Sequence, residues 1–393
     1  MKKSILTVLV ILMAVVQSCR DAGEKLSTAG NEYVASLQQI TSTFSRLSSI
    51  ADSLSAGLSE TEKERAGFFL ASAYSLVMES YVEKGDPADP GLTEWMSPTR
   101  KFGGDNPYTI YTQAPVDPSF VYRLTGRDGN AVYLGVQVYG FAQGFNLATA
   151  NLGLKDIRTD ADGSFTIYLS AVRPENVLNW IPLTSGDHAF LVRQYFRDRN
   201  SIIPSQLKLE RIDSVQKTGI SYLERLKRAE KMLHEYILGA IDINSLLREN
   251  AFNSYPSKEA QVRAPKYGGA LYPTKDNKYE GCWVSLKPGE VMNVHGFLPK
   301  KTLYASYVFY DRWYNTPNYR KINSFRTMDE IVLNSDGSFD LYISPEKIDH
   351  PNWIDTGGLY EGSYSSRYML SEETVFTDIK VIKISDVKKT VNE

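Results

Sequence analysis

The sequence is poor in the side chains that most often build metal sites and disulfides, since its 393 residues include 4 His and 2 Cys. Two cysteines exclude a disulfide scaffold. The four histidines lie far apart and have neither H-x-H nor H-E-x-x-H spacing. We therefore expect no metal site and no cofactor.

The sequence also lacks an excess of charge of one sign. It has 44 basic and 46 acidic residues, which give a formal net charge of −2. A near-neutral chain has no electrostatic footprint for nucleic acid. Hydrophobic residues make up 42% and charged residues 23%, which excludes general disorder, and the length favours two or three domains. No G-x-S-x-G, P-loop or G-x-G-x-x-G motif occurs.

Residues 1–18 have the pattern of an export signal. Two lysines precede the apolar run Ile5–Val16, which is too short to span a bilayer but typical of a signal peptide. The sequence Val-Gln-Ser-Cys at 16–19 resembles a bacterial lipobox, which implies a lipid on Cys19. The alternative is an ordinary secretory peptide with a chance cysteine. We expect a lipoprotein of the bacterial cell envelope, at the outer membrane or periplasmic face and not in the cytoplasm, whose membrane contact is the lipid.

The region 19–99 is expected to contain a helical hairpin over 24–84. Its second helix begins at a capping box formed by Ser59 and Glu62 and stops at Gly85-Asp86-Pro87. The stripe of the first helix either packs on its own chain or forms a coiled-coil surface for a partner. That stripe has helical spacing and consists of Leu26, Ala29, Tyr33, Leu37, Ile40, Phe44, Leu47, Ala51, Leu54 and Leu58.

Further along the chain the apolar period changes to two, which indicates strands. We expect β domains over 100–213 and 265–386, a connecting segment over 214–264 with a helix at 218–248, and a frayed tail over 387–393. Cys282 lies beside Trp283 in an apolar stretch, so its thiol is expected to be buried and inert.

The two β regions are internal repeats. Asp162-Gly163-Ser164-Phe165 matches Asp336-Gly337-Ser338-Phe339, and Asn179-Trp180-Ile181 matches Asn352-Trp353-Ile354. Each Asp-Gly pair is expected to supply the positive φ of a hairpin turn. About 110 residues with short strands favour a sandwich. The expected fold is mainly β with helical additions: two tandem, jelly-roll-like β-sandwiches joined by a helix and preceded by the helical hairpin.

The chain resembles the bacterial domain of unknown function family 1214 over about residues 100–386. The residues that carry this resemblance are Gly104-Asp105-Asn106-Pro107-Tyr108, the two Asp-Gly motifs, and Pro351-Asn352-Trp353-Ile354-Asp355-Thr356-Gly357-Gly358. The resemblance implies β-sandwich domains and no known activity. The family often has His where this chain has Gly358, so any catalytic role that this His has in other members is in doubt for this chain.

The most promising cluster for chemistry is Asn352, Trp353, Asp355, Thr356 and Arg367. One interpretation is structural: Asn and Asp shape a tight loop, and Arg367 forms an ion pair with Asp355. The other is functional. There, Arg367 clamps an anion or carboxylate, Trp353 forms a stacking floor, and Asp355 acts as an orienting group or as a base.

Other candidate binding residues lie elsewhere on the two repeats. In the first repeat Trp180 and Arg193 are kept, but Pro182 stands where Asp355 falls. Arg193 and Tyr195 share a strand face that either binds an acidic group or is a solvated sheet face. Trp313 belongs to an aromatic loop that either stacks on sugars or packs against the protein.

Together these features favour a protein that binds a small molecule or saccharide through aromatic and Arg-rich loops. The first alternative is a metal-independent hydrolase or lyase that uses Asp355, Arg367 and Tyr groups. The second is a scaffold protein that uses the N-terminal helical stripe.

Overall fold

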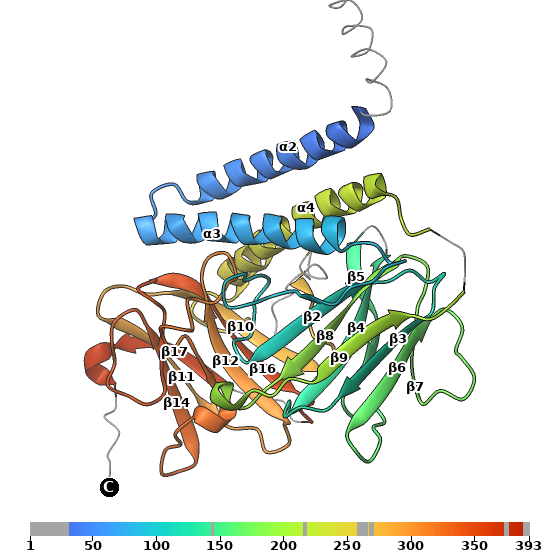
Figure 1. The fold of residues 1–393 in the computed structure, drawn as a ribbon. Helices are drawn as coiled ribbons and strands as arrows, with labels where there is room; N and C mark the ends of the chain where they lie inside the picture. Colours follow the sequence, from blue (N-terminus) through green and yellow to red (C-terminus); the bar gives the residue numbers. More distant parts are fainter. Residues whose placement is uncertain are drawn as a thin grey trace, which may run out of the picture.

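The computed structural model describes residues 31–142, 145–214, 218–257, 266, 271–372 and 377–387. The expected signal peptide and Cys19 lie outside these residues. Within them, two sandwich-like β halves stand side by side under a layer of helices (Figure 1). None of the described helices is long and apolar enough to cross a membrane.

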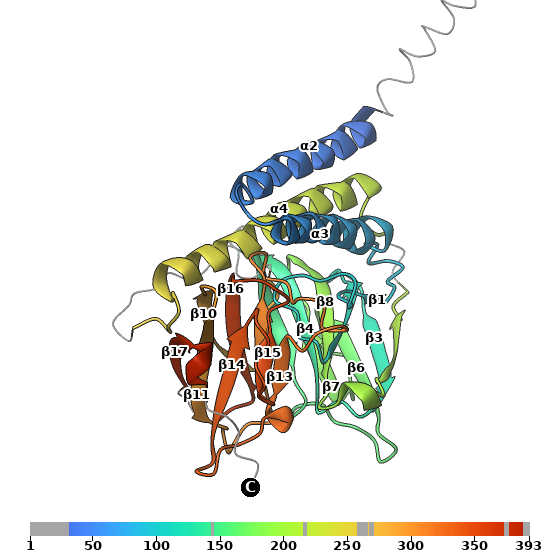
Figure 2. The same cartoon turned by 90° about the vertical axis from the view of Figure 1, so that its left-hand side faces the viewer.

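The helical layer contains α2 (Asn31–Leu54), α3 (Glu60–Val77) and α4 (Tyr222–Asn250). The predicted capping box is confirmed, since Ser59 and Glu62 exchange hydrogen bonds at the start of α3. After Val77 the chain continues as a π-helix, Met78–Glu83. A 90° turn shows the same layer resting on one end of both β halves (Figure 2).

The apolar stripe of α2 packs on its own chain along the middle of the helix. Ile40, Leu47 and Ala51 are at most 1% exposed and belong to one core with α3 and α4. Tyr33 and Leu37, nearer the helix start, and Leu54 at its end remain exposed, and Leu26 and Ala29 lie outside the described residues. The helices therefore form a three-membered layer that includes α4, rather than an isolated hairpin.

The first repeat has two sheets, one in the order β1-β2-β8-β4-β5 and one in the order β7-β6-β3-β9. The alternating apolar residues of β4 and β6 face each other between the sheets and form the core. The strands are β1 (Thr93–Glu94), β2 (Thr109–Pro115), β3 (Tyr122–Arg127), β4 (Tyr133–Ala142), β5 (Phe145–Leu152), β6 (Ser164–Ser170), β7 (Asn179–Pro182), β8 (Asp187–Tyr195) and β9 (Gln206–Arg211).

The second repeat has the same topology, with sheets ordered β10-β16-β12-β13 and β15-β14-β11-β17. Apart from the extra β1, each strand has a counterpart at the same place in the first repeat, which confirms the tandem duplication. The strands are β10 (Asn277–Ser285), β11 (Glu290–Phe297), β12 (Tyr304–Tyr310), β13 (Phe325–Thr327), β14 (Ser338–Ser344), β15 (Trp353–Asp355), β16 (Glu361–Met369) and β17 (Thr377–Lys383).

The Asp-Gly motifs form equivalent turns in the two repeats. Gly163 and Gly337 have φ of 78° and 83°, as the sequence predicts. The hairpin that we expected at these turns is absent, however. β6 pairs with β3 and β7, and β14 pairs with β11 and β15, so neither strand pairs with the strand directly before it.

Candidate functional site

The shared asparagine has the same structural role in both repeats. Asn352 donates from Nδ2 to the carbonyls of Val332 and Asp340 and accepts the Val332 N–H, at 2.7–3.0 Å. Asn179 makes the equivalent three bonds to Arg158 and Thr166. Both side chains are buried, and their hydrogen-bonding groups are used to pin a loop to the sheet.

The shared tryptophan also has one role in both repeats. The indole N–H of Trp353 lies 3.3 Å from the Ser344 carbonyl and 3.1 Å from its hydroxyl. Trp180 and Ser170 repeat this contact with the same distances. Because both copies keep the arrangement, the geometry favours the structural interpretation of this motif.

The expected ion pair between Asp355 and Arg367 is not formed. Asp355 accepts the N–H of Gly357 at 2.7 Å, in a turn of its own loop. Arg367 donates to the hydroxyl of Tyr310 and to the carbonyl of Gly104. The two residues belong to β15 and β16, which lie in opposite sheets of the sandwich, so the core separates them.

Arg193 is the counterpart of Arg367, and each arginine joins its own repeat to a segment near the start of the other. Arg193 donates to the Tyr139 hydroxyl at 2.9 Å and to the carbonyl of Tyr272. Arg193 and Arg367 are 2% and 5% exposed, so neither side chain is open to bind an anion from solution. We call this pair the arginine clamps.

The remaining predicted aromatic contacts are also internal. Tyr195 is buried, and its hydroxyl lies 2.9 Å from that of Thr274. Trp313 is 2% exposed and stacks on Phe69 of α3 at 5.5 Å, so it packs against the protein and offers no face to a sugar. Cys282 is buried, and burial raises the pKa of its thiol, as expected for an inert cysteine.

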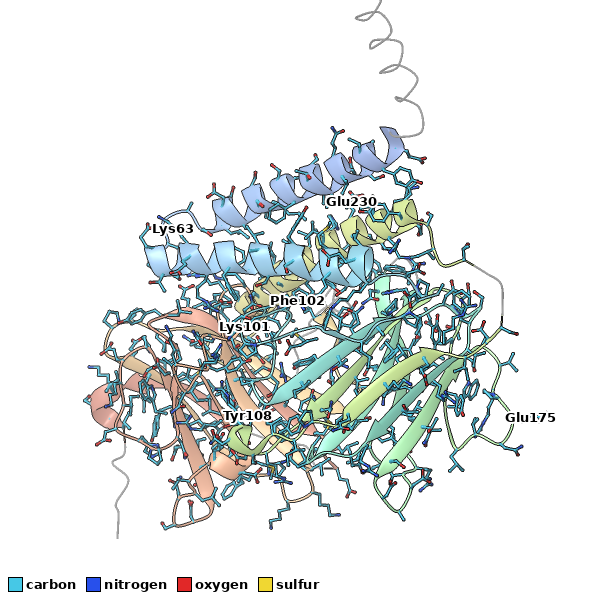
Figure 3. All side chains as sticks on the ribbon, in the orientation of Figure 1. Lys63, Lys101, Phe102, Tyr108, Glu175 and Glu230 are labelled. Carbon is cyan, nitrogen blue, oxygen red and sulfur yellow. The ribbon has the colours of Figure 1, made fainter. Side chains whose placement is uncertain are left out.

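A pocket of about 440 Å³ lies where α3 meets the second repeat. We call it the junction pocket. Its walls come from α3, from the segment 98–101 before β2, and from the loops 317–322 and 356–359. Figure 3 shows Lys101 in this region beneath α3. The lining includes Arg65, Phe68, Lys101, Lys321, Thr356 and Leu359.

Three cationic side chains and one carboxylate, Glu64, line the junction pocket, and one of the three, Arg65, also forms an ion pair with Asp311, which is not part of the lining. Arg65 donates from Nε to Asp311 and from Nη2 to the Thr316 carbonyl at 2.8 Å. These bonds orient the guanidinium and leave Nη1 with no hydrogen bond to any described residue. Lys321, from the loop 317–322, is an exposed part of the lining.

Lys101 is the buried cationic residue of the junction pocket. It is 3% exposed, and its ammonium donates to the hydroxyl and carbonyl of Thr316 and to the carbonyl of Pro317, at 2.5–3.0 Å. Burial lowers the pKa of Lys101 to about 8, and the charge of Asp105 opposes this shift. The ammonium therefore contributes positive charge to the pocket, while its protons are hydrogen-bonded to Thr316 and Pro317.

Thr356 and its loop are the one part of the predicted cluster that reaches the junction pocket. The Thr356 hydroxyl donates to the Leu359 carbonyl at 2.7 Å and holds the loop against the pocket wall. Sequence reasoning missed Arg65, Lys101 and Lys321. They come from three distant segments without a shared motif, and only the fold brings them together.

A second pocket of about 740 Å³ lies between the first half of α4 and the first repeat. Its charges balance, with three cationic side chains from α4 against Asp117, Asp187 and Glu224. Asp187 is occupied by bonds from Thr149 and Thr184. Within the described residues, no group of three or more His, Cys, Asp or Glu side chains could hold a metal ion.

Comparison with known families matches residues 101–198 and 269–366 to the model described as "Protein of unknown function (DUF1214)". The chain belongs to the DUF1214 family, in two tandem copies. No curated protein matches it. An uncharacterized protein from Burkholderia cenocepacia has a similar solved structure, with a TM-score of 0.81 and 24% identity over 91% of this chain and 99% of that one.

The VPA0106 protein from Vibrio parahaemolyticus is a more distant structural match, with a TM-score of 0.45 and 14% identity over 81% of this chain and 97% of that one. The Burkholderia structure supports the fold alone. The two DUF1214 copies supply Lys101, Lys321 and Thr356 to the junction pocket, whereas Arg65 and Glu64 come from α3, outside both matched segments.

Proposed function

We propose that this protein binds a small organic anion in the junction pocket, namely a carboxylate with an apolar body. The observation that carries the proposal is a pocket of about 440 Å³ with three cationic side chains and one acid. Small-molecule sites typically enclose about 300–1,000 Å³ and combine apolar walls with a few polar groups. Phe68, Ile322 and Leu359 supply the apolar wall here.

The binding of a small molecule was the leading expectation from the sequence, but the residues are different. The Trp and Arg side chains that favoured a saccharide site are engaged with the protein itself. The hydrolase or lyase alternative required Asp355 and Arg367 in one site, and these residues lie in opposite sheets. An anion-binding role therefore has the stronger support.

Thermal unfolding tests this proposal with matched probes. Benzoate should raise the midpoint of unfolding in a concentration-dependent way, because a ligand that binds only the native state stabilises it by mass action. Benzyl alcohol, which has the same ring without the charge, should have much less effect. The Lys321→Ala variant should lose most of the benzoate shift, whereas Lys63→Ala, on α3 but outside the pocket, should keep it. Equal shifts with acid and alcohol would contradict the proposal.

We further propose that the protein is exported and anchored in the bacterial cell envelope by a lipid on Cys19. The support is the signal-like sequence of residues 1–18 and the lipobox-like residues before Cys19. Radioactive palmitate should label the wild-type chain and should not label Cys19→Ala when both are expressed in a bacterium. Label retained in the variant would refute the anchor.

A further inference from the structure

The first half of α2 is unusual for an exposed helix because residues 33–45 contain no charged side chain. Solvated helix faces normally carry charged residues. Tyr33, Val34 and Leu37 are 44%, 52% and 38% exposed, and their spacing places them on neighbouring positions of one helix surface. This part of α2 therefore exposes an apolar surface that is cheap to desolvate.

Tyr222 at the start of α4 extends this surface. It is 41% exposed, and its ring lies 6.2 Å from that of Tyr33. We call Tyr33, Val34, Leu37 and Tyr222 the α2 patch. Beside it, the guanidinium of Arg225 lies 5.3 Å from the Tyr222 ring and donates to the Val82 carbonyl, so its charge is directed into the protein. Exposed tyrosines are typical of residues that sit at a membrane–water interface.

The position of the α2 patch in the fold and in the chain identifies what would cover it. Both views place α2 on the outer side of the helical layer, with α3 and α4 between it and the sheets (Figures 1 and 2). Eleven residues separate Cys19 from Asn31, which starts α2. A chain of this length reaches at most about 40 Å when fully extended, so a lipid on Cys19 keeps α2 close to the bilayer.

We propose that the α2 patch docks on the surface of the membrane that holds the lipid, so that the helical layer faces the bilayer and the β halves point away from it. This inference rests on the proposed lipid anchor. A lipid on one residue holds the end of the chain at the bilayer but does not fix the orientation of the protein, and a second contact would fix it. Tyr33, Tyr222 and the aliphatic pair would provide that contact without inserting a helix.

A spin label on the acylated full-length protein tests the docking. Cys282 is fully buried and Cys19 is modified, so a nitroxide reagent would label only a cysteine introduced as Val34→Cys. In vesicles of phosphatidylethanolamine and phosphatidylglycerol, the label at position 34 should gain collisions with oxygen and lose collisions with a nickel chelate. Ile50→Cys, farther along α2, and Val172→Cys, 80% exposed on the first repeat, are the matched controls and should stay accessible to the chelate.

Each other result overturns the docking. A label at position 34 that is as accessible to the chelate as that at position 172 would show that the patch faces water. Spin–spin broadening at position 34 would show that a second copy of the chain covers it. Flotation of the same sample with the vesicles separates the lipid anchor from the docking. If the protein floats while the label at position 34 stays accessible to the chelate, the anchor holds and the docking is wrong. If the protein does not float, both proposals are wrong.

Discussion

Arg367→Met is expected to lower the free energy of unfolding by about 3 kcal/mol, because a buried group left unsatisfied costs roughly 1–3 kcal/mol and two groups lose their donor. These groups are the Tyr310 hydroxyl and the Gly104 carbonyl, which would keep only a long contact of 3.4 Å with each other. Chemical denaturation measures the change. Arg320→Met, at an exposed site, is the control and should stay within about 0.5 kcal/mol of wild type.

The other arginine clamp should respond in the same direction but less strongly. Arg193→Met removes the donor to the Tyr139 hydroxyl, yet that hydroxyl keeps a contact of 2.6 Å with the amide of Gln137. The Tyr272 carbonyl still loses its bond from the arginine. If Arg367→Met behaved like Arg320→Met, the arginine clamps would not hold the two repeats together.

Benzoate affinity is expected to fall as pH rises above about 8, because Lys101 then loses the proton that makes the pocket floor cationic. Below that pH the ammonium is charged and affinity should be constant. Above this pKa, each further pH unit lowers the protonated fraction of Lys101 by up to about tenfold. Lys101→Met should bind benzoate weakly and without this pH dependence.

Titration calorimetry from about pH 6 to about pH 10 measures this profile, and Lys63→Met, outside the pocket, should reproduce the wild-type curve.

The stability of the protein should change with pH in the direction opposite to the benzoate affinity. The pKa of Lys101 is lowered from 10.5 to about 8 in the folded chain, so between these two pH values the unfolded chain binds more protons and stability rises with pH. If the wild-type affinity for benzoate did not change between pH values below and above 8, Lys101 would not contribute to benzoate binding.

The features that the sequence predicts well are those encoded locally or by duplication. Ser59 and Glu62 are three residues apart, so their capping box needs no tertiary information. Gly163 and Gly337 need positive φ whatever the surrounding sheet. The matching Asn-Trp-Ile motifs revealed two copies of one fold, and the strand orders of the two halves agree with this.

The functional residues could not be predicted in the same way, because spacing along the chain does not give the sheet to which a strand belongs. Asp355 and Arg367 are 12 residues apart in sequence, yet they fall in opposite layers. Arg65, Lys101 and Lys321 are far apart in sequence and line one pocket. The chain has 25 tyrosines, and some of them serve packing, since Tyr133, Tyr195 and Tyr304 form a buried cluster between the two repeats.

A crystal structure with 4-bromobenzoate tests the proposed function most directly, since the anomalous signal of bromine locates the ring without ambiguity. We expect one bromine site in the junction pocket, against the wall formed by Phe68 and Leu359, with the carboxylate towards Arg65 and Lys321. A bromine site beside α4 in the charge-balanced pocket, or none in the junction pocket at a saturating concentration, would contradict the proposal.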